Sequence, residues 1–262
     1  MVKKIYNSLV FSILFALLIF PCAAEDITIF FYNPDAAPPD PSIMIKKAGD
    51  YFSKANSSIK IQPVIDAAVF IKLIDDEKKA KIFITPQALL KTLKSKYKEI
   101  LLPVNDADAQ TYKRIVVVKE GVIKSIEELK GKTIGSTSFG NESVNFLNEF
   151  VFSSGSYDVN NSKIIYVKKD LDALLAAKFG QLQAAIIAER NLATIGKINP
   201  VAVKDTKILL TSKDIPEAPL CVVDGVPAEI EGAVKKAFAD MNGTPEGKEF
   251  LKLLGYSKWV EK

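Results

Sequence analysis

The sequence predicts an α/β protein with mainly parallel sheets. Short apolar runs alternate with segments of helical period along almost the whole chain, which is the pattern of strands joined by helices. The run Ile27–Phe31 is apolar or β-branched at every position and therefore indicates a buried strand. Helix start signals follow such runs closely, as at Thr85-Pro86. We see no internal repeat.

In the first part of the chain, further strands are expected at Ile59–Ile65 and Lys81–Ile84. Between the first two strands, Ser42 can cap a helix that follows a Pro-rich loop. After the third strand, Thr85-Pro86 leads into a helix near Gln87–Leu93. Each helix thus follows a strand, as an α/β fold requires.

The character of the chain changes near Tyr112, after which strands and helices alternate more regularly. Asp170 can cap one helix there, and Thr244-Pro245 starts the last helix, which Gly255 ends. The expected strands are Arg114–Val118, Lys132–Gly135, Lys163–Val167, Ala184–Ala188, Lys207–Leu210 and Leu220–Val223.

The most informative segment is Ser125–Phe150. Ser125 and Glu128 have capping-box spacing and predict a short helix before the strand Lys132–Gly135. A loop with three hydroxyls (Ser136, Thr137 and Ser138) then precedes a second helix. Hydroxyls and free N–H groups at a helix N-terminus suit an anion, whereas the simpler interpretation is an ordinary βα turn that caps the helix. On residue types alone, the two interpretations have equal weight.

The first 24 residues have the pattern of a secretory signal peptide. Lys3 and Lys4 precede an apolar core from Leu9 to Phe20, and small residues follow up to Ala24. We expect cleavage after Ala24 and export to the periplasm, and a lipid anchor on Cys22 is the alternative. Losing the two lysines lowers Lys+Arg from 35 to 33 against 31 Asp+Glu, a net charge of about +2. A charge so near zero gives no support for nucleic acid as a partner.

Absent residue types exclude whole classes of chemistry. The chain has no histidine, which removes Ser-His-Asp and Cys-His catalysis and every histidine-containing metal site. Once Cys22 leaves with the signal, Cys221 is alone in an apolar run, so we expect a buried structural thiol, no disulfide and no thiolate metal site. We predict no cofactor, no metal and no enzymatic activity.

Four segments together resemble the periplasmic phosphonate- and phosphate-like oxyanion-binding proteins of ABC transporters. They read SIEELKGKTIGSTSFGNES, DLDALLAAKFGQLQAAII, TSKDIPEAPLCVV and TPEGKEFLKLLGY, and they fall within residues 110–256. The resemblance implies a two-lobed type II binding-protein fold with a ligand cleft between lobes. Carried onto this chain, lobe one is 25–110 plus 213–262, and lobe two is 111–212.

The same resemblance implies a set of ligand-binding residues. Ser136, Thr137 and Ser138 would hold the anion from lobe two, and Asn33, Thr85 and Gln87 would face it from lobe one. Each of the lobe-one residues also fits a plain turn or capping role. Glu189 and Arg190 follow the strand Ala184–Ala188 and are further candidates. Arg190 could bind an oxyanion in two-pronged fashion, or instead pair at the surface with Glu189 or Asp172.

The chain departs from the aminophosphonate binders of that family. Those proteins carry a histidine near the position of Lys169-Asp170, and an acidic residue where this chain has Ala218. These departures favour a simpler oxyanion or a different solute over an aminoalkyl phosphonate. The expected function is capture of a small oxyanion by a monomeric exported protein that delivers it to an ABC permease. The alternatives are a ligand-sensing receptor of the same fold that partners a membrane sensor kinase, or a binder of a non-phosphorus solute.

Overall fold

A computed structural model describes residues 27–35, 40–55, 57–76, 81–153 and 157–262. The expected signal peptide, with Cys22, lies outside these residues, as does the middle of the Pro-rich loop. Within them, no helix is both long and apolar enough to cross a bilayer.

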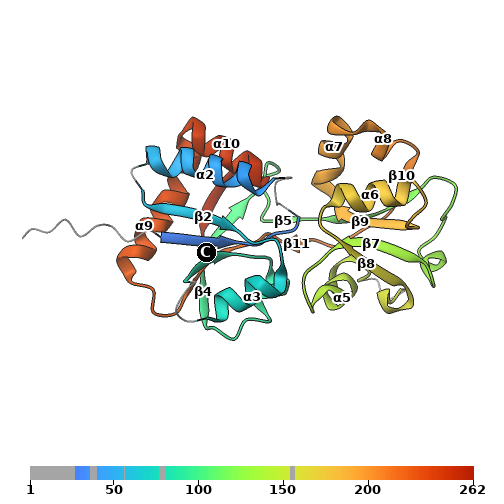
Figure 1. Cartoon of the computed structure of the whole chain (residues 1–262), viewed down its shortest axis with the longest axis horizontal. Coiled ribbons are helices and arrows are strands. Elements are labelled where there is room, and N and C mark those ends of the chain that lie inside the picture. The colour runs from blue at the N-terminus through green and yellow to red at the C-terminus, as the bar shows by residue number, and fades with distance from the viewer. Residues whose placement is uncertain (1–26, 36–39, 56, 77–80, 154–156) are drawn as a thin grey trace, which may run out of the picture.

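The described chain forms two α/β bodies side by side, joined by a narrow two-stranded ribbon (Figure 1). The ribbon pairs β5 (Thr111–Tyr112) with β11 (Ile215–Pro216). We call the body around the larger sheet lobe one and the other body lobe two. Because the ribbon strands stand where the chain leaves and re-enters lobe one, the two lobes are connected by two crossings.

Lobe one is built on a six-stranded mixed sheet in the order β13-β4-β12-β3-β1-β2. Strand β1 pairs in parallel with β2 and β3, whereas β12 and β13 return antiparallel from the C-terminal part of the chain. The strands are β1 (Ile27–Phe31), β2 (Ile59–Pro63), β3 (Ile82–Ile84), β4 (Tyr97–Val104), β12 (Leu220–Val223) and β13 (Lys258–Glu261). The helices are α2 (Pro41–Lys54), α3 (Ala67–Asp75), α4 (Gln87–Leu90), α9 (Ala228–Ala239) and α10 (Pro245–Leu254), with a 3₁₀ turn η4 (Asp240–Gly243).

Lobe two is built on a five-stranded mixed sheet in the order β10-β6-β9-β7-β8. Strand β7 pairs in parallel with β8 and β9, and β6 lies antiparallel between β9 and β10. The strands are β6 (Arg114–Lys119), β7 (Thr133–Thr137), β8 (Lys163–Val167), β9 (Ala184–Ala188) and β10 (Thr206–Thr211). The helical segments are η1 (Glu127–Leu129), α5 (Ser143–Phe146), the π-helical turn η2 (Leu147–Val151), η3 (Val159–Asn161), α6 (Asp170–Lys178), α7 (Glu189–Ile198) and α8 (Pro200–Val203).

The prediction of an α/β fold with two lobes is confirmed, with one refinement. A parallel core is present in each lobe, but the sheets are mixed because the crossing strands add antiparallel neighbours. The helix starts also differ in detail. Asp40, and not Ser42, caps α2, because Pro41 occupies its first position and the Asp40 carboxylate accepts the Ser42 N–H at 2.9 Å. Gly255 ends α10 with a left-handed φ of 79°, as expected.

The two lobes are in contact through both apolar and polar groups. One buried cluster runs from Tyr32 and Phe70 of lobe one to Phe139 and Phe146 of lobe two. Gly140 has a φ of 62°, and a Cβ there would lie 3.2 Å from the Ala67 side chain of lobe one. Glycine is therefore needed at this position both for its backbone conformation and for the close approach of the lobes.

Candidate functional site

The carboxyl ends of the parallel strands from both lobes meet at the junction between the lobes. The Tyr32 hydroxyl, just after β1, donates to the Ser138 carbonyl just after β7 at 2.7 Å. Asn191 of α7 donates from Nδ2 to the Asp35 carbonyl at 3.3 Å. Ligands of open α/β sheets bind beyond these strand ends, so the junction is the candidate site.

Arg114 is the central residue of this junction. It is the first residue of β6 and pairs with Ala188 at the end of β9, because β6 runs antiparallel to β9. Its side chain is fully buried, and Nη2 donates to Thr137 Oγ1 and to the Ile186 carbonyl, both at 2.9 Å. The guanidinium also lies 5.3 Å from the centre of the Phe139 ring, within cation–π range.

Arg114 retains unused donors. Its Nε and Nη1 are buried and have no hydrogen-bond partner among the residues that the structure describes. Buried guanidinium donors are costly to leave unpaired, because they have lost their hydration. The site is therefore able to accept further acceptor atoms at Arg114.

Two carboxylates flank the guanidinium. Asp35 Oδ1 of lobe one lies 3.7 Å from Arg114 Nη2, and Asp170 Oδ1 of lobe two lies 4.0 Å from the same nitrogen. Asp35 accepts a 2.6 Å hydrogen bond from the Tyr112 hydroxyl and a 3.3 Å bond from Thr137 Oγ1. These contacts join the hinge ribbon and both lobes in one buried polar cluster.

Asp170 follows β8, at the start of α6, and points into the cluster. The expectation that its side chain caps α6 is wrong, because Lys169 is the cap residue and Asp170 lies inside the first turn. Its Oδ2 accepts the Ala188 N–H at 2.9 Å and the Asn191 amide at 2.8 Å. Burial, followed by the charge of Asp35, raises the pKa of Asp170 to about 7, although Arg114 opposes the shift. A carboxyl of this kind is only partly ionised at neutral pH.

A second ion pair lies beside the cluster, and it decides the role of Arg190. Nη1 and Nη2 of Arg190 donate to Glu217 Oε1 at 2.7 Å and Oε2 at 3.3 Å. The guanidinium lies 4.7 Å from the Tyr112 ring centre and 5.9 Å from that of Tyr256. Arg190 thus pairs neither with Glu189 nor with Asp172, and its Nη atoms are occupied by Glu217. Glu189 itself is exposed at the start of α7.

The three hydroxyl residues predicted to bind the anion have different positions and partners in the structure. Strand β7 extends to Thr137, so Ser136 and Thr137 belong to the strand and not to a loop. The Ser136 hydroxyl donates to the Thr137 carbonyl at 3.0 Å, and Ser138 Oγ accepts the Gly140 N–H at 3.1 Å. Of these three hydroxyls, that of Thr137 contacts Arg114.

In the predicted anion-binding loop, a backbone N–H group is already hydrogen-bonded to a side chain of the same segment. The Phe139 N–H donates to Ser143 Oγ at 2.7 Å, and the Phe139 ring stacks on Phe146 with centres 4.1 Å apart. The helix that follows begins with only four α-helical residues. The loop therefore resembles the ordinary capping turn of the simpler interpretation, and Thr137, the last residue of β7 before it, contacts the cluster.

The three candidate ligand-binding residues of lobe one differ in their burial and in their hydrogen-bond partners. Asn33 is buried, accepts the Asp35 N–H at 3.1 Å, and donates to the Tyr256 hydroxyl at 3.3 Å. Thr85 is buried at the end of β3, and its hydroxyl has no partner in the described part of the chain. Gln87 donates to Glu99 at 3.1 Å and lines a separate cavity. Asn33 therefore supports the cluster through Asp35.

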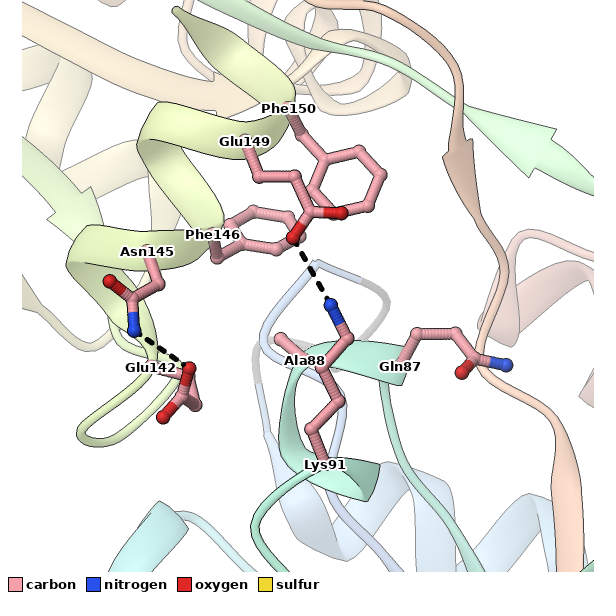
Figure 2. Close-up of a pocket in the computed structure, with 8 residues that line it drawn as sticks. All are labelled: Gln87, Ala88, Lys91, Glu142, Asn145, Phe146, Glu149 and Phe150. Atoms are coloured by element: carbon pink, nitrogen blue, oxygen red, sulfur yellow. Dashed lines mark hydrogen bonds and ion pairs between the residues drawn. The ribbon is translucent and has the colours of Figure 1, made fainter. Parts of the chain in front are cut away.

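The cavity at Gln87 lies between α4 of lobe one and the α5–η2 segment of lobe two (Figure 2). Its volume is about 30 Å³, which is space for a water molecule or two. Lys91 and Glu149 form an ion pair across it at 3.1 Å. The cavity is lined by Gln87, Ala88, Lys91, Glu142, Asn145, Phe146, Glu149 and Phe150.

Sequence reasoning missed the central residues of the junction. Asp35 was given no role, and Arg114 was treated only as the first residue of the predicted strand Arg114–Val118. A signal was present, because Arg114 directly precedes the apolar run Ile115–Val118 and a charge at the edge of a buried strand must have partners. Cys221, by contrast, is a free and buried thiol, as predicted. In the described residues, no group of three or more His, Cys, Asp or Glu could hold a metal ion.

Comparison with known proteins identifies the family. Residues 32–262 match the family model of the periplasmic substrate-binding protein of the phosphonate ABC transporter. A search of the curated proteins gives no significant match.

Solved structures share the fold. A binding-protein component of an ABC phosphonate transporter from Pseudomonas aeruginosa superposes with a TM-score of 0.74 at 16% identity, over 90% of this chain and 81% of that one. A Prochlorococcus marinus protein in complex with methylphosphonate gives 0.68 at 12% identity, over 90% and 92%. A Xanthomonas citri protein bound to ATP gives 0.66 at 12% identity, over 89% and 90%. With a family match over nearly its whole described length, the chain belongs to the periplasmic substrate-binding proteins of phosphonate ABC transporters.

Proposed function

We propose that this protein captures a small oxyanion, phosphonate- or phosphate-like, at Arg114 and Thr137 between the lobes, and delivers it to an ABC permease. The observation that carries the proposal is the fully buried Arg114 guanidinium, whose Nε and Nη1 lack partners among the described residues. A charged ligand oxygen would satisfy these donors, and charge-assisted bonds of this kind are stronger than neutral ones.

The two-lobed arrangement supports capture by closure. Arg114 and Thr137 belong to lobe two, whereas Asp35 and Tyr32 belong to lobe one, so the polar groups surround one point only when the lobes are together. A ligand that binds the closed form better shifts the population toward it, and no chemical step is required. We therefore propose a binding protein without enzymatic activity, monomeric and exported through cleavage after residue 24, with no role for nucleic acid.

Ser138 beside Thr137, Asn33 beside Asp35, and Thr85 directly after β3 remain proposed contributors. Ser136 and Gln87 have less support, since their polar groups are used by the Thr137 carbonyl and by Glu99. Arg190 is proposed as a support for the hinge, because Glu217 occupies its Nη atoms.

A thermal-shift panel tests this function. The exported form (residues 25–262) is heated with phosphate, phosphite, sulfate, methylphosphonate and aminoethylphosphonate. A ligand present at about 100 times its Kd adds roughly 2.7 kcal/mol to the free energy of unfolding, which raises Tm by a few degrees. We expect a shift with at least one phosphorus oxyanion that is lost in Thr137→Val and kept in the control Thr133→Val, in the same strand. A panel without any shift would exclude the proposed ligand class.

A further inference from the structure

Asp35 reaches out of lobe one into the anion-binding groups of lobe two. It lies four residues beyond the end of β1, and its Oδ1 accepts from Thr137 Oγ1 at 3.3 Å, 3.7 Å from Arg114 Nη2. Its Oδ2 accepts from the Tyr112 hydroxyl at 2.6 Å. Both carboxylate oxygens are therefore held by groups outside lobe one.

The main chain around Asp35 fixes this orientation. Asn33 Oδ1 accepts the Asp35 N–H at 3.1 Å, and Asn191 Nδ2 of lobe two donates to the Asp35 carbonyl at 3.3 Å. The residue is only 1% exposed. Hydrogen bonds thus hold Asp35 at its side chain, its N–H and its carbonyl. Together they restrict both the rotamer of the side chain and the backbone conformation.

Asp35 contacts two of the groups assigned to the proposed oxyanion, Thr137 and Nη2 of Arg114, and leaves Arg114 Nε and Nη1 without partners among the described residues. Thr137 and Arg114 are the described lobe-two donors at this point, and the Asp35 carboxylate already accepts from Thr137. With the neighbouring Arg190–Glu217 pair included, the two guanidiniums of the junction face three carboxyl groups, of which Asp170 is only partly ionised. A further buried anion beside Asp35 would meet strong repulsion in a medium of low dielectric.

We propose that Asp35 is an internal anion: it holds the two lobes together in the ligand-free protein, and a captured oxyanion takes its place at Thr137 and Arg114. This inference rests on the proposed function for the identity of the competing ligand. The closure part does not, because the contacts of Asp35 with Thr137 and Arg114 of lobe two need no solute. Asp35 thereby sets how tightly an oxyanion must bind to be captured.

The state of Asp170 is consistent with such an exchange. The charge of Asp35 is one cause, after burial, of the raised pKa of Asp170. An oxyanion that replaces Asp35 would bring its own negative charge to the same place, so Asp170 would keep a raised pKa in the complex. Asp170 can therefore remain in place while the two anions exchange.

The test compares Asp35→Asn with the matched control Asp224→Asn in residues 25–262. Asp224 is an exposed lobe-one carboxylate, so its removal changes the net charge equally without touching the junction. Two measurements are made: the radius of gyration of the ligand-free protein by small-angle X-ray scattering, and the Kd of methylphosphonate by calorimetry. Asp35→Ala is measured alongside, because an asparagine amide can keep part of the bond with Tyr112.

We expect both Asp35 variants to be more expanded than the wild type when ligand-free. We also expect them to bind methylphosphonate about tenfold more tightly or better, because the competing carboxylate is gone; tenfold corresponds to about 1.4 kcal/mol. Asp224→Asn should match the wild type in both. Ligand-free Asp35 variants as compact as the wild type would overturn the inference, and so would an unchanged or weaker affinity for methylphosphonate. If no oxyanion binds any form, the proposed function fails, while the scattering result still decides whether Asp35 closes the lobes.

Discussion

Arg190 and Glu217 connect lobe two to the hinge by a partly buried ion pair with two hydrogen bonds, whose N–O distances are 2.7 and 3.3 Å. Glu217 is 2% exposed and directly follows β11 in the crossing ribbon, whereas Arg190 lies in the first turn of α7. The rings of Tyr112 and Tyr256 lie near the guanidinium. The pair therefore fixes the angle at which α7 meets the ribbon and lobe one.

Arg190→Met is expected to destabilise the protein strongly. It leaves the Glu217 carboxylate buried without a counter-charge, which typically costs about 3–5 kcal/mol. Arg190→Met/Glu217→Gln should recover part of this loss, because the uncompensated charge is removed. Urea unfolding gives the free energies. The exposed pair of Lys113 and Asp214, 3.8 Å apart, is the control, and Lys113→Met should cost about 1 kcal/mol or less. Equal costs at the two sites would contradict the role of Arg190.

The raised pKa of Asp170 predicts a pH dependence of stability. A carboxyl with a pKa of about 7 in the folded protein and its ordinary value of 3.8 when unfolded binds a proton more tightly in the folded state. Its contribution is therefore fully present below pH 4 and is lost as the pH rises toward and through 7. We expect Asp170→Asn to remove this loss, so that its stability relative to the wild type improves by on the order of 1 kcal/mol or more between pH 4 and pH 8.

The control for this pH dependence is Asp172→Asn, an exposed carboxylate on the same helix. It should follow the wild-type profile of stability against pH, measured by urea unfolding at each pH. If Asp170→Asn also follows the wild-type profile, then Asp170 does not hold an extra proton in the folded protein.

The close packing around Gly135, in the strand that positions Thr137, leaves little room for a side chain. A Cβ at Gly135 would lie 2.5 Å from Leu182 Cδ1 and 3.2 Å from the Ala173 Cβ of α6. Gly135→Ala should therefore destabilise the fold by about 1–3 kcal/mol through overpacking. Gly232→Ala in α9 is the opposite case, since beyond the helix's own backbone and the two chain neighbours no atom lies within 4 Å of the new methyl group, and it should stabilise by about 0.4–1 kcal/mol. Thermal unfolding shows whether each variant is more or less stable than the wild type, and a neutral Gly135→Ala would show that Leu182 and Ala173 can move aside without cost.

The Tyr112 hydroxyl is predicted to be worth more than an ordinary surface hydrogen bond. It donates to Asp35 at 2.6 Å in a buried setting, and burial followed by the charge of Asp35 raises the pKa of Tyr112 well above its usual value. Tyr112→Phe leaves the carboxylate without this donor and should cost about 1–3 kcal/mol. Tyr166→Phe, at a half-exposed position in β8, should be close to neutral in the same denaturation experiment. Similar values for the two variants would place the Asp35 carboxylate in contact with solvent.

The sequence was sufficient to predict most strands and the region of the site, and the reason is local. Runs such as Arg114–Val118 and Ala184–Ala188 are apolar enough to indicate buried strands, and polar residues at their ends indicate the edge where ligands bind. The strand predicted at Lys132–Gly135 ends two residues later, at Thr137, because Ser136 and Thr137 were assigned to a loop on account of their hydroxyls.

The cluster itself depends on contacts that no local pattern specifies. Arg114 reaches the carboxyl ends of β7 and β9 only because β6 runs antiparallel to β9, a pairing between distant segments. Asp35 meets Thr137 across 102 positions of sequence and Tyr112 across 77. Arg190 finds Glu217 because the returning strand β11 lies along β5. Which residues become partners in this cluster is therefore decided by the topology of the sheets and the ribbon.

The most direct test of the account is a calorimetric titration of methylphosphonate into the wild type, Arg114→Lys and Arg190→Lys. Lysine keeps the positive charge but loses the planar set of donors, and the same change at the two arginines provides the comparison. We expect one site per chain in the wild type, a Kd weakened about tenfold or more in Arg114→Lys, and a smaller change in Arg190→Lys. Undiminished binding by Arg114→Lys, or a larger loss in Arg190→Lys, would show that the oxyanion does not bind at Arg114.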